Sequence, residues 1–96
     1  MHAVVRRYRG ASALNDLLAQ RSQQDVERLL SDVPGFVAYY AIRAGDELAT
    51  VTVCDDQAGT QESSRRAAEW VRQNLTGGTV GAPEITEGEA FIQFSR

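Results

Sequence analysis

The chain has 96 residues, of which 43% are hydrophobic and 24% are charged, and its net charge at pH 7 is −3. This length predicts a single domain, 1–96, with one modest core. The acidic balance and the lack of a basic patch argue against nucleic acid as a partner. No apolar run approaches the ~20 residues that a membrane span needs.

The ionisable residues exclude several chemistries. Cys54 is the only cysteine, so no intrachain disulfide can form, and every residue among the ten Lys and Arg is an arginine, which excludes a Schiff base on lysine. One histidine and one cysteine do not make a metal site. The N-terminal sequence becomes charged after a very short apolar stretch, unlike a signal peptide, so we expect a cytoplasmic protein.

The first third of the chain predicts a strand and a helix. His2–Arg9 is rich in Val, Tyr and Arg and predicts the strand. Ser12 is a candidate N-cap for the helix that follows. The apolar stripe of this helix drifts at the wholly polar Arg21–Gln24, where we expect a bend or two short pieces. Pro34 and Gly35 end the helix.

The rest of the chain predicts a hairpin, a second helix and a last strand. Phe36–Arg43 is dense in β-branched and aromatic residues and Leu48–Cys54 alternates, which together predict a β-hairpin. Asp55 and Asp56 are candidate N-caps for a helix over Gln57–Leu75, and Ile85–Phe94 predicts the last strand. The apolar stripe of that helix comprises Ala67, Ala68, Val71 and Leu75, with Trp70 at its edge. The order βαββαβ is the ferredoxin-like α+β arrangement, with both helices on one face of an antiparallel sheet.

The hairpin divides its residues between the two faces of that sheet. We expect the mostly apolar set beneath the helices. It comprises Phe36, Ala38, Tyr40, Ile42, Ala49, Val51 and Val53. The opposite set, expected on the open face, comprises Val37, Tyr39, Ala41, Arg43, Leu48, Thr50, Thr52 and Cys54. Because soluble monomers avoid exposed apolar patches, we expect the open face to pack against a second subunit.

The order of strands expected for this fold also places the first and last strands side by side. Arg7 and Arg9 would then oppose Glu87 and Glu89, which we interpret as a surface ladder of charges rather than a functional site.

Three segments carry a resemblance to a known superfamily. They are the Val33–Val37 connection with its Pro-Gly turn, the Thr50–Asp56 strand that runs into a helix, and Arg66–Val71 with Trp70. The chain resembles the dimeric α/β-barrel superfamily, near the antibiotic-biosynthesis-monooxygenase-like proteins. This resemblance implies a homodimer that packs sheet against sheet, with a cleft between sheet and helices in each protomer. Members include cofactor-free monooxygenases, haem-degrading enzymes and proteins of no known activity, so the fold alone does not give a function.

Several catalytic interpretations were weighed. A cofactor-free monooxygenase acting on a quinol-like substrate needs an apolar pocket and a group that stabilises an anion, for which Trp70 and Asn74, one helical turn apart, are the candidates. Haem degradation needs an axial ligand, and His2 lies at the chain terminus. Two neighbouring carboxylates disfavour Cys54 as a nucleophile. Ser63 and its neighbour lie in a predicted helix without a histidine to act as base.

The sequence leaves the enzyme question open, because no residue set supplies a general acid–base pair. We predict a homodimeric α/β-barrel protein without a cofactor, with a small, largely apolar pocket in each protomer for an aromatic or apolar ligand. The alternatives are the cofactor-independent monooxygenase and a structural dimer without a ligand. Arg43 could hold a carboxylate or phenolate, or bridge the dimer interface. The candidate ligand-binding residues are Tyr8, Tyr39, Arg43, Thr50, Thr52, Trp70 and Asn74.

Overall fold

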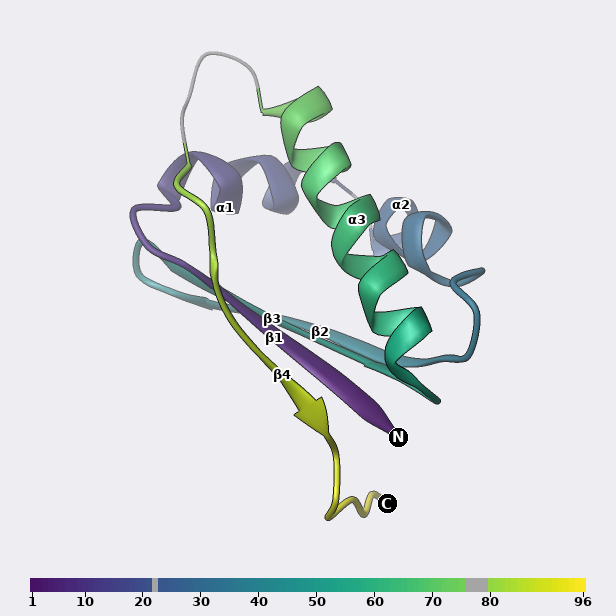
Figure 1. Ribbon diagram of the computed structural model, residues 1–96. Coiled ribbons are helices and arrows are strands. Elements are labelled where there is room, and N and C mark those ends of the chain that lie inside the picture. The colour runs from purple at the N-terminus through teal and green to yellow at the C-terminus, as the bar shows by residue number, and fades with distance from the viewer. Residues whose placement is uncertain (22, 76–79) are drawn as a thin grey trace.

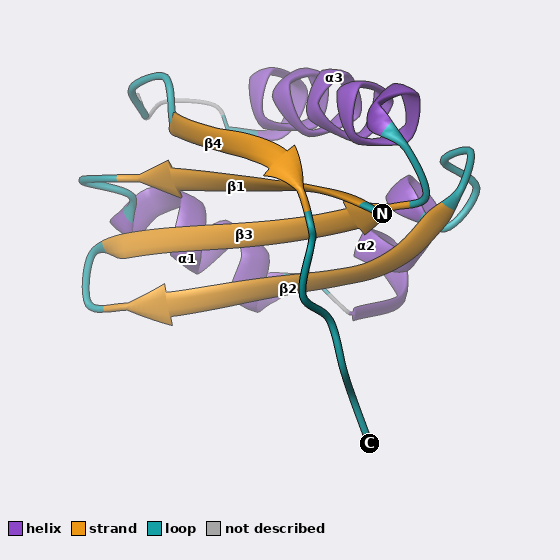
Figure 2. Ribbon diagram, turned by 60° about the horizontal axis from the view of Figure 1, so that its bottom comes forward, coloured by secondary structure: helices purple, strands orange, loops and turns teal. Residues whose placement is uncertain are grey.

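The computed structural model describes residues 1–21, 23–75 and 80–96, which form a four-stranded antiparallel sheet with three helices on one of its faces (Figure 1). The elements are β1 (His2–Tyr8), α1 (Ser12–Gln20), α2 (Gln23–Leu30), β2 (Phe36–Ala44), β3 (Glu47–Cys54), α3 (Gln57–Asn74) and β4 (Glu84–Glu89). The strand order is β2-β3-β1-β4, and the face opposite the helices is open (Figure 2). The predicted ferredoxin-like α+β fold is confirmed. None of the described helices combines the length and the apolar character needed to cross a membrane.

The predicted first helix is two pieces, α1 and α2, which confirms one of the two expected alternatives. Residue 22, inside the polar stretch that predicted the break, lies outside the described residues. The predicted cap is wrong, because Ser12 lies inside α1 and the N-cap is Ala11, whose side chain cannot accept a hydrogen bond.

β4 is shorter than predicted and ends at Glu89 rather than Phe94. Beyond β4, the Ala90 N–H donates to the Met1 carbonyl at 3.0 Å. Phe91, Ile92 and Phe94 leave the sheet and are 83%, 71% and 89% exposed.

The pairing within the hairpin is as predicted, but its two faces are exchanged. Tyr40 pairs with Val51 and Ile42 with Ala49, yet Tyr40 and Ile42 are 63% and 54% exposed on the open face. The polar strand positions lie beneath the helices instead. By strand alternation, the helix side carries Tyr39, Ala41, Arg43, Leu48, Thr50, Thr52 and Cys54, and the open side carries Ala38, Tyr40, Ile42, Ala49, Val51 and Val53.

One feature of the structure explains this exchange, and a second explains why Phe36 is an exception to it. The covered hydroxyls surround a buried arginine of β1 and a cavity, so a covered face need not be an apolar one here. Phe36 stays on the helix side as predicted, because an irregularity of register between Phe36 and Ala38 separates it from the alternation of β2. It packs against a buried cluster of Leu30, Val33 and Cys54.

The predicted charge ladder between β1 and β4 is wrong in its register. Arg7 pairs with Glu84, and Arg9 Nη2 lies 3.5 Å from the same carboxylate, whereas Glu87 and Glu89 lie opposite Val4 and His2. β1 and β4 lie side by side, as expected, but no hairpin joins them, so neighbouring residues along the chain do not fix their register.

α3 approaches the sheet closely at its first turns. The Asp56 carboxylate accepts a hydrogen bond from the Gly59 N–H at 3.2 Å, which confirms one of the two predicted N-caps. A Cβ on Gly59 would lie 2.4 Å from the Pro34 carbonyl oxygen and 2.7 Å from the Cys54 Cβ, so only glycine fits there. Thr60 and Ser63 are fully buried. Figure 1 shows α3 diverging from the sheet toward its C-terminal end.

Candidate ligand-binding site

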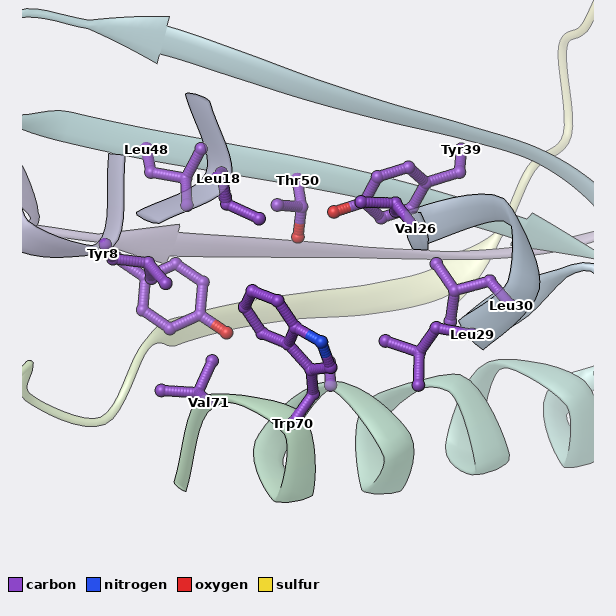
Figure 3. Close-up of a pocket in the computed structure, with 12 residues that line it drawn as sticks. Tyr8, Leu18, Val26, Leu29, Leu30, Tyr39, Leu48, Thr50, Trp70 and Val71 are labelled. Carbon is purple, nitrogen blue, oxygen red and sulfur yellow. The ribbon is translucent and has the colours of Figure 1, made fainter. Parts of the chain in front are cut away.

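A small cavity lies where α3 has diverged from the sheet, and we call it the inner cavity. Its volume is about 40 Å³, room for very few water molecules. Four of the predicted site residues line it, namely Tyr8, Tyr39, Thr50 and Trp70 (Figure 3). Apolar side chains of the three helices, together with Leu48 of β3, complete its wall.

A wider space, the outer cleft, lies between the α1–α2 segment and β2. Its volume is about 620 Å³, within the ~300–1,000 Å³ that is usual for ligand pockets. The two spaces share Leu18, Val26, Leu30 and Tyr39 in their linings. The inner cavity is therefore the deep end of a cleft that a small molecule can enter from the α1–α2 side.

Three hydroxyls, of Tyr8, Tyr39 and Thr50, line the inner cavity, and none has a hydrogen-bond partner among the described residues. Thr50 is 5% exposed, and its Oγ1 is buried with no hydrogen-bond partner. Figure 3 shows the Tyr39 hydroxyl directed toward Thr50 and the Tyr8 hydroxyl directed toward Trp70. Burial raises the pKa of both phenols, against the opposing influence of Arg6. At neutral pH both tyrosines are thus neutral groups that can donate or accept a hydrogen bond.

Trp70 occupies a more central position than predicted. Its ring lies between Tyr8 and Leu29 in Figure 3 and packs against the core cluster that includes Leu14 and Leu48. The predicted apolar stripe of this helix placed Trp70 at its edge, but Ala68 of that stripe is exposed. The sheet-facing side of α3 instead includes small polar residues at its first turns, which hydrophobicity alone does not identify.

Three of the predicted site residues do not reach the inner cavity. Arg43 is exposed on β2. Thr52 is fully buried and accepts a hydrogen bond from Arg6 Nη1 at 3.2 Å. Asn74 donates to the Trp70 carbonyl at 2.8 Å and accepts from Arg21 Nη2 at 3.3 Å, so it stabilises the end of α3.

Arg6 is the residue that the sequence interpretation missed. It is 2% exposed, and burial lowers the pKa of its guanidinium. The signal was present in β1, where Val4, Arg6 and Tyr8 share one face by alternation and all three are buried. The pKa of the Cys54 thiol is raised by burial and by two neighbouring aspartates, which argues against a nucleophilic thiolate.

Comparisons with known proteins define the fold class. No family model and no curated protein matches the chain. Among solved structures, a dimeric ferredoxin-like protein from an uncultured marine organism is similar with a TM-score of 0.68 and 15% identity, covering 99% of this chain and 98% of that one. A protein of unknown function from Nitrosomonas europaea has a TM-score of 0.67 and 19% identity, covering 99% and 93%.

The cofactor-independent oxygenase SnoaB from Streptomyces nogalater, in a mutant form, is also similar, with a TM-score of 0.65 and 14% identity, covering 99% of this chain and 97% of that one. The chain thus has the ferredoxin-like fold found in antibiotic-biosynthesis-monooxygenase-like proteins. At these identities the similarity establishes the fold, and the activity has to be argued from the residues of the site.

Proposed function

We propose that the protein binds a small aromatic ligand that carries a hydroxyl or carbonyl group. The aromatic ring would lie in the outer cleft, and its polar substituent would reach into the inner cavity. The observation that carries this proposal is the buried Thr50 hydroxyl, which has no partner. A buried polar group left without a hydrogen bond costs about 1–3 kcal/mol, and a ligand oxygen would remove that cost.

Two further features support an aromatic ligand. The lining of the outer cleft includes Leu18, Val26 and Phe36 beside the Tyr39 ring, which suits a flat apolar molecule. The hydroxyls of Tyr8 and Tyr39 make no hydrogen bond within the described part of the chain, so they too are available to a ligand.

Calorimetric titration with 1-naphthol, compared with naphthalene, tests the proposal. We expect 1-naphthol to bind more tightly than naphthalene, and Thr50→Val to weaken 1-naphthol binding about three- to tenfold, because one neutral hydrogen bond is lost. Thr86→Val is the matched control, since Thr86 lies exposed on β4. Equal affinity of wild type and Thr50→Val for 1-naphthol would contradict the proposal.

A cofactor-independent monooxygenase acting on a quinol-like substrate is the second candidate. It is favoured by the Trp70 ring beside three hydroxyls in an apolar cavity, an arrangement that would stack and orient an electron-rich ring. Oxygen uptake with a dihydroxynaphthalene, corrected for auto-oxidation, tests it, and Trp70→Phe should abolish the uptake. Uptake equal to the protein-free rate would reject the enzyme and leave the binding proposal standing.

We also infer a homodimer formed through the open face of the sheet. Tyr40 and Ile42 are more than half exposed there, and a monomer would leave this apolar face in water. The exposed apolar side chains of the C-terminal segment add to the surface that a partner would cover. A second copy is the proposed occupant because a two-fold dimer needs only one self-complementary patch. The dimeric ferredoxin-like neighbour supports this assembly.

A further inference from the structure

Arg6 is a buried positive charge without a carboxylate partner. Within residues 1–21, 23–75 and 80–96, no acidic side chain lies within 4.0 Å of its guanidinium. Glu87 on β4 acts on Arg6 only through space and is exposed to solvent. A buried charge that is not neutralised is costly, and buried arginines are usually paired with an anion.

All the side-chain partners of Arg6 are neutral hydroxyls. Nη1 donates to Thr52 Oγ1 at 3.2 Å, and Nη2 donates to Ser63 Oγ at 2.9 Å and to Ser64 Oγ at 2.8 Å. Nε also donates to Ser64 Oγ, at 3.3 Å. These bonds fix the guanidinium in place, but none of them brings a negative charge into contact with it.

The two serines that hold Arg6 differ in whether their own hydroxyl hydrogen has an acceptor. The Ser63 hydroxyl accepts from Arg6 and donates to the Thr60 carbonyl at 2.7 Å, so its bonding is complete. The Ser64 hydroxyl accepts twice from Arg6, and no acceptor for its hydrogen occurs among the described residues. Two donors from one cation polarise this hydroxyl and make it a strong donor to an anion.

Ser64 lines a crevice between α3 and β4 that is separate from the outer cleft. The volume of the crevice is about 320 Å³, and its lining includes Arg6, Ser64 and the apolar side chains of Ala68, Val71 and Ile85. Tyr8 lines the crevice as well as the inner cavity. The crevice thus combines a fixed cation at its floor with apolar walls, which suits an organic anion.

We propose that Arg6 and Ser64 form a binding site for the carboxylate of a small organic acid. Ser64 Oγ donates to the carboxylate, the guanidinium supplies the positive charge, and the apolar body of the acid packs along Val71 and Ile85. This site takes a different class of ligand from the inner cavity, and it does not depend on the function proposed for that cavity.

Benzoate is the probe and benzamide is its neutral isostere, each titrated into the full chain by calorimetry. We expect benzoate to bind at least ten times more tightly than benzamide. Ser64→Ala should weaken benzoate binding at least tenfold, since a hydrogen bond to a charged group is lost. Ser63→Ala is the comparison variant, because Ser63 helps to hold Arg6 but has no free hydroxyl hydrogen to donate, and we expect a clearly smaller loss of benzoate affinity than for Ser64→Ala.

Arg6→Met keeps most of the side-chain volume and should abolish benzoate binding, with folding checked by circular dichroism. If that variant does not fold, the comparison of the two serine variants decides. Equal losses in Ser63→Ala and Ser64→Ala would mean that the serines only hold Arg6, and this would overturn the proposal. No binding of benzoate up to about 10 mM, or equal binding of benzamide, would overturn it too.

Discussion

The two faces of the sheet are reversed in polarity: the face that the helices cover carries polar residues, and the open face carries apolar ones. The covered face carries Arg6, Thr50 and Thr52, whereas Tyr40 and Ile42 point into solvent on the open face. In a monomeric protein, a sheet with helices on one face usually buries its apolar face under them and exposes its polar face to solvent. This inversion supports the two proposals that the polar groups under the helices bind a ligand and that the apolar open face packs against a second subunit.

The largest effect is expected for Ile42→Asp, which breaks the inferred contact of the open face. In a two-fold dimer the substitution counts twice, so burying two carboxylates should weaken the dimer about a thousandfold, or about 4 kcal/mol. Light scattering coupled to size exclusion would measure the mass at micromolar concentration. Ala41→Asp is the control, because Ala41 is exposed on the other side of the same strand. A monomeric wild type would reject the dimer itself.

The next largest effect is the loss of stability expected when a substitution creates a cavity under the covered face. Leu48 is 4% exposed in the core cluster, so Leu48→Ala should lower the free energy of unfolding by about 2–4 kcal/mol. Val51 is on the same strand but on the open side, and Val51→Ala should cost less than about 1 kcal/mol. Urea unfolding in the Ile42→Asp background keeps subunit contacts out of the measurement. Similar losses in both variants would mean that the two faces do not differ in packing.

A smaller effect is expected where α3 meets the sheet. Gly59→Ala forces a Cβ against the Pro34 carbonyl and should lower stability by about 1–3 kcal/mol. Gly81→Ala is the matched control, since a Cβ there meets nothing within 4 Å. Thermal unfolding would compare the two midpoints. An unchanged midpoint for Gly59→Ala would show that the helix can move away from the sheet without loss.

The smallest effect is a dependence of stability on alkaline pH. Burial raises the pKa of Tyr8 and Tyr39 above the ordinary value of 10.0, so the folded state disfavours the phenolates. Their contribution to stability is complete below pH 10 and is lost as the pH rises through the raised folded-state values. Between pH 9 and 12, the free energy of unfolding measured in urea should fall less steeply with pH in a Tyr8→Phe/Tyr39→Phe variant than in the wild type. An equal dependence of the free energy of unfolding on pH in both proteins would show that the two tyrosines are not its cause.

The fold was predictable because its signals are local. Alternation in β3, the Pro-Gly turn and the aspartate cap each act over a few residues, and the structure confirms the elements that they predict. Four of the seven candidate residues, Tyr8, Tyr39, Thr50 and Trp70, line one cavity, although Tyr39 and Thr50 were expected on the open face of the sheet. They are the polar or aromatic members of elements that the fold must bring together.

The errors arose where a prediction needed long-range information. Which side of the hairpin the helices cover was inferred from hydrophobicity, and Arg6 reverses that inference through its bonds to Thr52 and to two serines of α3. Those partners lie 46 to 58 positions away along the chain. Alternation in β1 groups Arg6 with Val4 and Tyr8, but hydrogen bonding across such separations leaves no pattern within one segment, so neither the partners of the guanidinium nor its crevice could be predicted.

The close approach of Gly59 to the sheet makes the space between α3 and the sheet wedge-shaped. The narrow end is held by Gly59, Thr60 and Ser63 against the strand ends, and the space opens toward Trp70, about three helical turns further on. The tilt of the helix is therefore set at Gly59, which lines neither the inner cavity nor the outer cleft. For the ligand binding proposed above, the thickness of the ligand that the cleft accepts would depend on residue 59, where glycine has a hydrogen atom in place of a methyl group.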